Sequence, residues 1–116
     1  MAVVLRDLRD DDRALLIRAT LENMNWCGAG FTREQVIDDP SIAHYFVAWP
    51  NSGDFGFVAL GPSRRPIGVV WLCHFDDADP GYGYVGDDIP ELSIWVDSDH
   101  RGGGIGSALL AGIIAR

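Results

Sequence analysis

The stretch that decides the fold is HRGGGIGSALL, His100–Leu110, in which four glycines fall within the five positions 102–106. A strand-like segment, ELSIWV at Glu91–Val96, precedes it, and an apolar, helix-forming tail follows it. A strand, a glycine-rich turn and a helix N-terminus together favour anion binding, because converging backbone N–H groups and the helix dipole supply partial positive charge. Glycine has no side chain to hold the anion away. The sequence therefore predicts a phosphate-binding turn at residues 102–106.

Two common phosphate-binding patterns do not fit this turn. A P-loop requires Gly-Lys-Ser/Thr, and the chain has no lysine. A dinucleotide fingerprint would need glycine at position 107, which is Ser107, and an acidic residue about 20 positions further on, where the sequence has already ended. The pattern that remains is R/Q-x-x-G-x-G/A, which residues 101–106 satisfy.

Composition limits the ligands and the setting. The 116 residues, 47% hydrophobic and 22% charged, are expected to form one soluble globular domain. Seventeen acidic residues against nine arginines give a formal net charge of −8, which disfavours nucleic acid and anionic membranes as partners. No apolar run is long enough to span a membrane, and no signal peptide is evident, so a cytoplasmic location is expected. Cys27 and Cys73 have no C-x-x-C spacing, and no metal site is predicted.

The rest of the chain predicts strands and helices in a mixed order. The pattern indicates a strand at 3–8, a helix at about 11–25, a short helix from the capping box Thr32–Gln35, a further helical turn or a strand at 40–49, a hairpin of strands at 54–60 and 67–75, a strand at 91–96 and a helix at 107–116. On the strand at 91–96, Glu91, Ser93 and Trp95 are expected to face one way and the residues between them the other. The predicted class is α/β of the α+β type: a mainly antiparallel sheet of about four strands with helices on both faces.

The quoted stretch, extended to PELSIWVDSDHRGGGIGSALLAGII at 90–114, resembles the GNAT superfamily of N-acetyltransferases. It looks like the central strand, pyrophosphate loop and following helix of that family, and the upstream order of strand, helices, hairpin and strand is also similar. DFGFVAL, RRPIGVVWL and GYGYVGDDIPELSI further resemble a bacterial branch of small GNAT proteins. The resemblance implies an enzyme that moves an acetyl group from acetyl-coenzyme A, its co-substrate, to a primary amine on a small molecule or peptide.

The resemblance also implies roles for individual residues. The pyrophosphate would lie in the loop of Gly102, Gly103, Gly104, Ile105, Gly106 and Ser107, bordered by Arg101. The pantetheine arm would follow the strand through Ile94, Trp95 and Val96, with the thioester carbonyl near the backbone N–H of Ile94 or Trp95. Glu91 is the expected general base, acting directly or through water. Tyr82 and Tyr84 are the candidates for lining the acceptor pocket.

The family's fold continues beyond the helix with further strands, which the sequence does not contain after Arg116. Residues 1–116 are therefore expected to be a GNAT-like domain without its C-terminal strands. The strand at 91–96 is then expected to leave an open edge, and Ile105, Leu109 and Ile113 an exposed apolar patch. A homodimer or completion by another chain would cover both. The alternative to an enzyme is a non-catalytic module that binds coenzyme A or a nucleotide, or an inactive truncated remnant.

Overall fold

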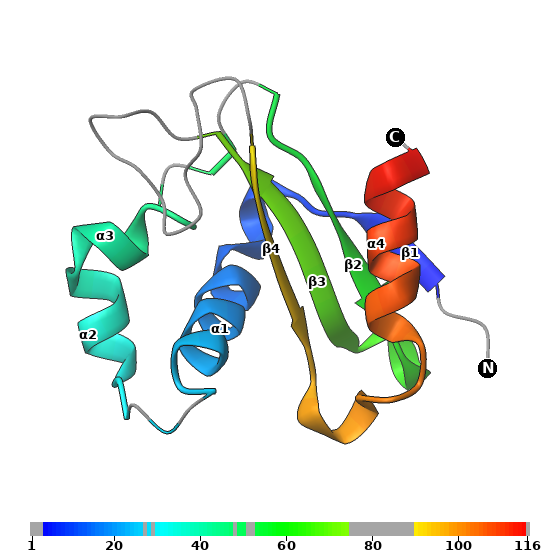
Figure 1. The fold of residues 1–116 in the computed structure, drawn as a ribbon, viewed down its shortest axis with the longest axis horizontal. Coiled ribbons are helices and arrows are strands. Elements are labelled where there is room, and N and C mark those ends of the chain that lie inside the picture. The colour runs from blue at the N-terminus through cyan, green and yellow to red at the C-terminus, as the bar shows by residue number, and fades with distance from the viewer. Residues whose placement is uncertain are drawn as a thin grey trace.

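The computed structural model describes residues 4–26, 28, 30–47, 49–50, 53–74 and 90–115. Four strands form one sheet in the order β1-β2-β3-β4, and every neighbouring pair is antiparallel (Figure 1). The strands are β1 Val4–Asp7, β2 Gly56–Leu60, β3 Pro66–Cys73 and β4 Glu91–Val96. The predicted antiparallel sheet of four strands is confirmed, and the predicted bounds of β4 agree with the structure.

Helices cover both faces of this sheet, as the sequence predicts. On one face lie α1 (Arg13–Met24), α2 (Arg33–Asp38) and α3 (Pro40–Ala43), and on the other lies α4 (Ile105–Ala115) (Figure 1). Each face has its own apolar cluster. The first includes Leu16, Val36, Ile42, Phe46, Val58, Val69, Trp71 and Trp95, and the second Ala59, Ile67, Val70, Ile105 and Leu109. The sheet is therefore the middle layer of three.

Polar side chains make hydrogen bonds just before α1 and at the start of α2. Helix α1 itself has no side-chain cap hydrogen bond, whereas Thr32 caps α2. Asp12 accepts hydrogen bonds from the Arg9 backbone N–H at 2.9 Å and from both terminal nitrogens of Arg6 at 2.8 and 2.9 Å. The hydrogen bonds from Arg6 lower the pKa of Asp12, so this stabilisation is lost only as the pH falls through that lowered pKa. The predicted capping box of Thr32 and Gln35 is present, with N–H to oxygen distances of 3.2 and 2.8 Å.

The segment at 40–49 has no strand among its described residues. Asp39 accepts from the Ser41 backbone N–H at 3.0 Å, and Pro40 takes the first helical position, as its motif predicts. The helix ends at Ala43, and turns follow through Phe46. The core nevertheless includes Tyr45, Phe46 and Trp49. These aromatic residues are buried although they belong to no helix or strand.

The prediction that Ile105, Leu109 and Ile113 form an exposed apolar patch on the last helix is wrong. Ile105 and Leu109 are 3% and 0% exposed, because that face of α4 packs on β2 and β3, and Ile113 is partly buried beside them. Leu110 and Ile114 carry the exposed apolar surface instead, at 40% and 83%. The glycine-rich loop ends at Gly104, so the helix begins at Ile105, two residues earlier than predicted.

Gly56 tests how tightly the sheet is packed. A Cβ at this position would lie 2.3 Å from the Val70 carbonyl oxygen and 2.9 Å from the Trp71 Cα, both in the backbone of β3. Gly56→Ala is therefore expected to lower the free energy of unfolding by about 1–3 kcal/mol, measured by urea denaturation. Gly103→Ala is the matched control, because its Cβ would make only an ordinary 3.4 Å contact with the His100 carbonyl. Equal unfolding midpoints for the two variants would contradict the described pairing of β2 with β3.

Candidate functional site

The centre of the candidate site is the edge of β4 that pairs with no strand among the described residues, called the free edge below. Its other edge pairs with β3, and the Asp97 backbone N–H continues that pairing by donating to the Ile67 carbonyl at 2.8 Å. In an antiparallel pair, alternate residues direct their backbone groups to the same neighbour. The odd-numbered residues of β4 therefore face β3, and the N–H and C=O groups of Leu92, Ile94 and Val96 face away from it.

Two side chains already reach carbonyls on this free edge. Asn23 at the end of α1 donates from Nδ2 to the Ile94 carbonyl at 2.9 Å, and Arg101 donates from Nε to the Val96 carbonyl at 3.2 Å. Both contacts agree with the alternation of β4. The resemblance implied that the thioester carbonyl lies near the backbone N–H of either Ile94 or Trp95. In the structure the Ile94 N–H faces the free edge, and the Trp95 N–H faces β3.

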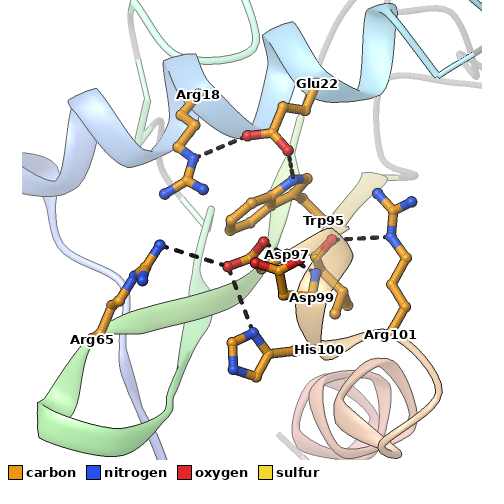
Figure 2. A network of polar contacts seen from close by, with 9 residues as sticks. Arg18, Glu22, Arg65, Trp95, Asp97, Asp99, His100 and Arg101 are labelled. Carbon is orange, nitrogen blue, oxygen red and sulfur yellow. Dashed lines mark hydrogen bonds and ion pairs between the residues drawn. The ribbon is translucent and has the colours of Figure 1, made fainter.

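The side chains of β4 divide between the two faces of the sheet, as predicted. Trp95 is 1% exposed and belongs to the cluster under α1, whereas Ile94 and Val96 pack toward α4. The Trp95 indole N–H donates to Glu22 Oε1 at 3.2 Å, and the Arg18 guanidinium lies 4.9 Å from the ring centroid (Figure 2). The packing of Trp95 against α1 therefore fixes which face of β4 points toward α1, close to the free edge.

The glycine-rich loop leads from β4 into the N-terminus of α4. Gly102 and Gly104 have φ angles of +85° and +81°, a conformation that favours glycine. The Ala108 N–H donates to the Gly104 carbonyl at 3.0 Å, so the N–H groups of Ile105, Gly106 and Ser107 precede the first helical hydrogen bond. A Cβ at Gly102 or Gly104 would meet no atom within 4 Å. The loop therefore opens onto free space, and the N–H groups at the start of α4 have no backbone partner among the described residues.

A cavity of about 450 Å³ lies over these donors. It is lined by Val96, His100, Arg101, Gly102, Gly104, Ile105, Gly106 and Ser107. All eight come from the end of β4, the loop and the first turn of α4, and most of them were predicted from the sequence as cofactor-binding residues. The structure thus brings most of the predicted loop residues together around one cavity.

Asp97 ties the loop to the rest of the sheet. Its side chain is buried, at 5% exposure, and its Oδ2 lies 3.5 Å from His100 Nδ1 and 3.8 Å from Arg65 on the β2–β3 turn (Figure 2). Its Oδ1 accepts from the Asp99 backbone N–H at 3.4 Å. One buried carboxylate therefore lies between the hairpin and the segment that enters the glycine loop.

A second cavity, about 280 Å³, lies beside the free edge. Its lining is Asn23, Trp26, Ile94, Trp95, Val96 and Arg101. The Arg101 guanidinium lies 4.2 Å from the Trp26 ring centroid, so it crosses from the loop to the end of α1. Sequence analysis missed Asn23 and Trp26, because nothing in their pattern distinguishes them from other residues at a helix end.

The carboxylate of Glu91 lies at the other end of β4. The Tyr45 hydroxyl donates a hydrogen bond to Glu91 Oε2, and the Tyr45 carbonyl accepts from the Trp71 indole N–H at 3.1 Å. A third cavity of about 180 Å³ opens here, lined by Thr20, Asn23, Met24, Tyr45, Trp71, Glu91 and Ser93. Tyr45 was not predicted as a site residue. Tyr82 and Tyr84, which were predicted, lie outside the described residues.

The comparisons with known proteins agree with this geometry. Residues 2–116 match the family described as "Acetyltransferase (GNAT) domain". The chain belongs to the GNAT acetyltransferase family. No curated protein matches the sequence closely enough to count as a relative.

Solved GNAT structures share the fold at low sequence identity. A GCN5-related N-acetyltransferase from Ralstonia eutropha is 23% identical with a TM-score of 0.67, over 98% of this chain and 74% of that one. A phosphinothricin acetyltransferase from Sinorhizobium meliloti in complex with acetyl-CoA is 24% identical with a TM-score of 0.65, over 100% and 60%. A predicted acetyltransferase from Clostridium acetobutylicum, solved with acetyl-CoA, is 16% identical with a TM-score of 0.69, over 98% and 72%. The chain thus spans 60–74% of the length of these three GNAT proteins.

The described residues contain neither a membrane-spanning helix nor a metal-binding cluster. Within the described ranges, no helix combines the length and the apolar character that crossing a membrane requires. The same residues contain no cluster of three or more His, Cys, Asp or Glu side chains that would hold a metal ion.

Cys73 provides a test of the packing behind Glu91. Burial raises the pKa of the Cys73 thiol, and the charges of Asp54 and Glu91 raise it further. Thiolate is the reactive form, so at pH 8 this thiol is expected to react with a disulfide reagent far more slowly than free cysteine. The measurement uses Cys27→Ser, a substitution outside the described residues, so that Cys73 is the remaining thiol, with the urea-unfolded chain as the control. Fast labelling of the folded chain would show that this part of the core opens.

Proposed function

We propose that the chain catalyses transfer of the acetyl group of acetyl-coenzyme A to the nitrogen of a primary amine. The observation that carries this proposal is the free edge of β4, which runs from an anion cradle at one end to the Glu91 carboxylate at the other. Membership of the GNAT acetyltransferase family supports it. The acetyl-CoA named with two of the similar structures supports the same co-substrate.

The cradle fits a pyrophosphate. The donors are the unpaired backbone N–H groups at the start of α4, on Ile105, Gly106 and Ser107, and the helix dipole adds about half a positive charge there. Open space at Gly102 and Gly104 leaves room for the anion to approach the backbone. Arg101 also lines this cavity. These local donors would bind a phosphate group despite the formal net charge of −8.

The free edge fits the amide-containing arm of the co-substrate. The Val96 N–H would pair with an amide carbonyl of the arm in the manner of an added strand, while Asn23 and Arg101 hold the Ile94 and Val96 carbonyls. The Ile94 N–H would then donate to the thioester carbonyl oxygen. As negative charge develops on that oxygen during attack, such a donor is worth about 3 kcal/mol.

Glu91 would act as the general base. It lies three residues from Ile94, roughly 10 Å along the strand, a distance that its side chain and one water span together. The amine arrives protonated, loses a proton to the Glu91 carboxylate, and its nitrogen lone pair forms the new bond to the carbonyl carbon. The carbon–sulfur bond then breaks, and its electron pair leaves on the coenzyme A sulfur. The nitrogen loses its second proton, which the departing thiolate takes up, so the products are a neutral amide and the coenzyme A thiol. Glu91 then releases its proton to solvent. Tyr45 would hold the carboxylate in place through its hydrogen bond.

A cytoplasmic location and association with a second chain stay predictions. The free edge of β4 and the exposed Leu110 and Ile114 on α4 support association, because unpaired strand edges and apolar surface favour contact with another chain.

Glu91→Gln tests the base. It is expected to lower turnover by about 10²–10⁴-fold, because the amide cannot accept the proton, while the affinity for acetyl-CoA stays nearly unchanged. Thiol release with a panel of amines gives the rate, and calorimetry gives the affinity. Glu34→Gln, an exposed substitution on α2, is the matched control. An unaltered rate across pH would remove Glu91 from this role, and binding without turnover in the unsubstituted chain would favour a non-catalytic module.

Gly104→Val tests the cradle. The new side chain would fill the space in front of the backbone donors, so the affinity for coenzyme A is expected to fall by at least about tenfold, or about 1.4 kcal/mol. Gly28→Val is the matched control, since Gly28 also has a positive φ, +79°, and also meets nothing within 4 Å. Both variants carry about 1–2 kcal/mol of backbone strain, which urea denaturation measures. Equal losses of affinity in the two would show that the cradle does not hold the cofactor.

A further inference from the structure

We infer that the cavity at Glu91 selects primary amines on neutral or cationic chains and discriminates against amines that carry a carboxylate. This inference rests on the proposed function, because it assigns the acceptor to the same site. Three observations carry it: the charge of the cavity lining, a buried hydroxyl without a partner, and the size of the cavity.

The described part of the cavity lining holds one acid and no base. Of the seven described residues that line the cavity, Glu91 is the only charged one. The arginines with described contacts are engaged elsewhere: Arg6 with Asp12, Arg13 with the carbonyls of Phe46 and Trp49, Arg18 with Glu22, Arg65 with Asp97, and Arg101 with the Val96 carbonyl and Trp26. The sequence that links β3 to β4, residues 75–89, contains five aspartates and neither Arg nor Lys. A carboxylate in this cavity would therefore face Glu91 without a counter-cation from these residues.

The cavity does contain acceptors that suit an ammonium group. Thr20 lines it, is 6% exposed, and has a hydroxyl oxygen without a hydrogen-bond partner among the described residues. A buried hydroxyl without a partner destabilises the fold unless a ligand satisfies it. An ammonium has three N–H donors, and the Thr20 oxygen and the Glu91 carboxylate together offer acceptors to them.

The cavity is also small and partly apolar. Its volume is about 180 Å³, below the 300–1,000 Å³ of typical ligand pockets, and Met24 and Trp71 contribute apolar walls. It therefore takes an amine and its first few methylene groups, while the rest of the substrate lies outside. A negative charge within four or five bonds of the nitrogen would have to remain close to Glu91.

Three amines with the same four-carbon skeleton test this inference. n-Butylamine has a neutral end, putrescine a cationic end and γ-aminobutyrate an anionic end. Their binding to the chain is measured by calorimetry in the presence of saturating coenzyme A, which does not depend on turnover. We expect n-butylamine and putrescine to bind at least about tenfold more tightly than γ-aminobutyrate, because like charges at this separation repel in a partly buried site.

Variants locate the selectivity in this cavity. Met24→Arg adds a cation to the lining and is expected to reduce the preference for n-butylamine over γ-aminobutyrate by about tenfold, whereas Met24→Gln, the matched neutral control, keeps it. Circular dichroism checks that both variants fold. Should Met24→Arg not fold, Glu91→Gln is expected to narrow the same ratio, because it removes the repelling charge.

The outcomes separate this inference from the proposed function. The expected order of binding supports the selectivity whether or not thiol release follows, and absence of thiol release would count against the acetyltransferase reaction alone. Equal or tighter binding of γ-aminobutyrate overturns the selectivity. Binding of coenzyme A with no binding of any amine also overturns it, because the cavity would then not be an acceptor site.

Discussion

The pairing of β4 with β3 through the odd-numbered residues of β4 is the constraint on which the site depends. That single register directs Glu91 and Trp95 to the side of the sheet that α1 covers, and it leaves the backbone groups of Ile94 and Val96 without a strand partner among the described residues. A shift by one residue would exchange the two faces and turn the free backbone groups toward β3. The buried indole of Trp95, held by Glu22 and Arg18, opposes such a shift.

Charge is arranged locally in this molecule. The chain as a whole is acidic, yet the loop at the start of α4 collects backbone donors beside a cavity whose described lining residues include no acid. The buried Asp97 lies just behind the loop, and its carboxylate is close to the His100 ring and to the Arg65 guanidinium. An anion at this loop would therefore be attracted by oriented peptide groups a few ångströms away, and not by the net charge of the protein.

The sequence predicts those parts of the fold and site that depend on neighbouring residues. The glycine spacing at 102–106, the alternation of β4 and the caps at Thr32 and Asp39 are local patterns, and the structure agrees with them. The rotation of α4 was predicted less well. Leu109, Leu110, Ile113 and Ile114 all read as one apolar face, and only contact with the sheet decides that Leu109 is buried and Ile114 exposed.

Contacts between distant segments could not be predicted in this way. Tyr45 and Glu91 are 46 residues apart, and Asn23 and Ile94 are 71 apart. Tyr45, in the turn after α3, and Asn23, at the end of α1, both contact β4. No spacing in the sequence predicts these contacts. Tyr45 also belongs to the core, since the residue is 6% exposed.

Asn23 borders both the cavity beside the free edge and the cavity at Glu91, while its amide holds the Ile94 carbonyl. Asn23 therefore lines two cavities at once. Its side chain cannot turn to suit a molecule in one cavity without changing the shape and the polar groups of the other. The affinities of two ligands in these cavities are then linked through one rotamer, and thermodynamic reciprocity requires each ligand to change the binding of the other by the same factor.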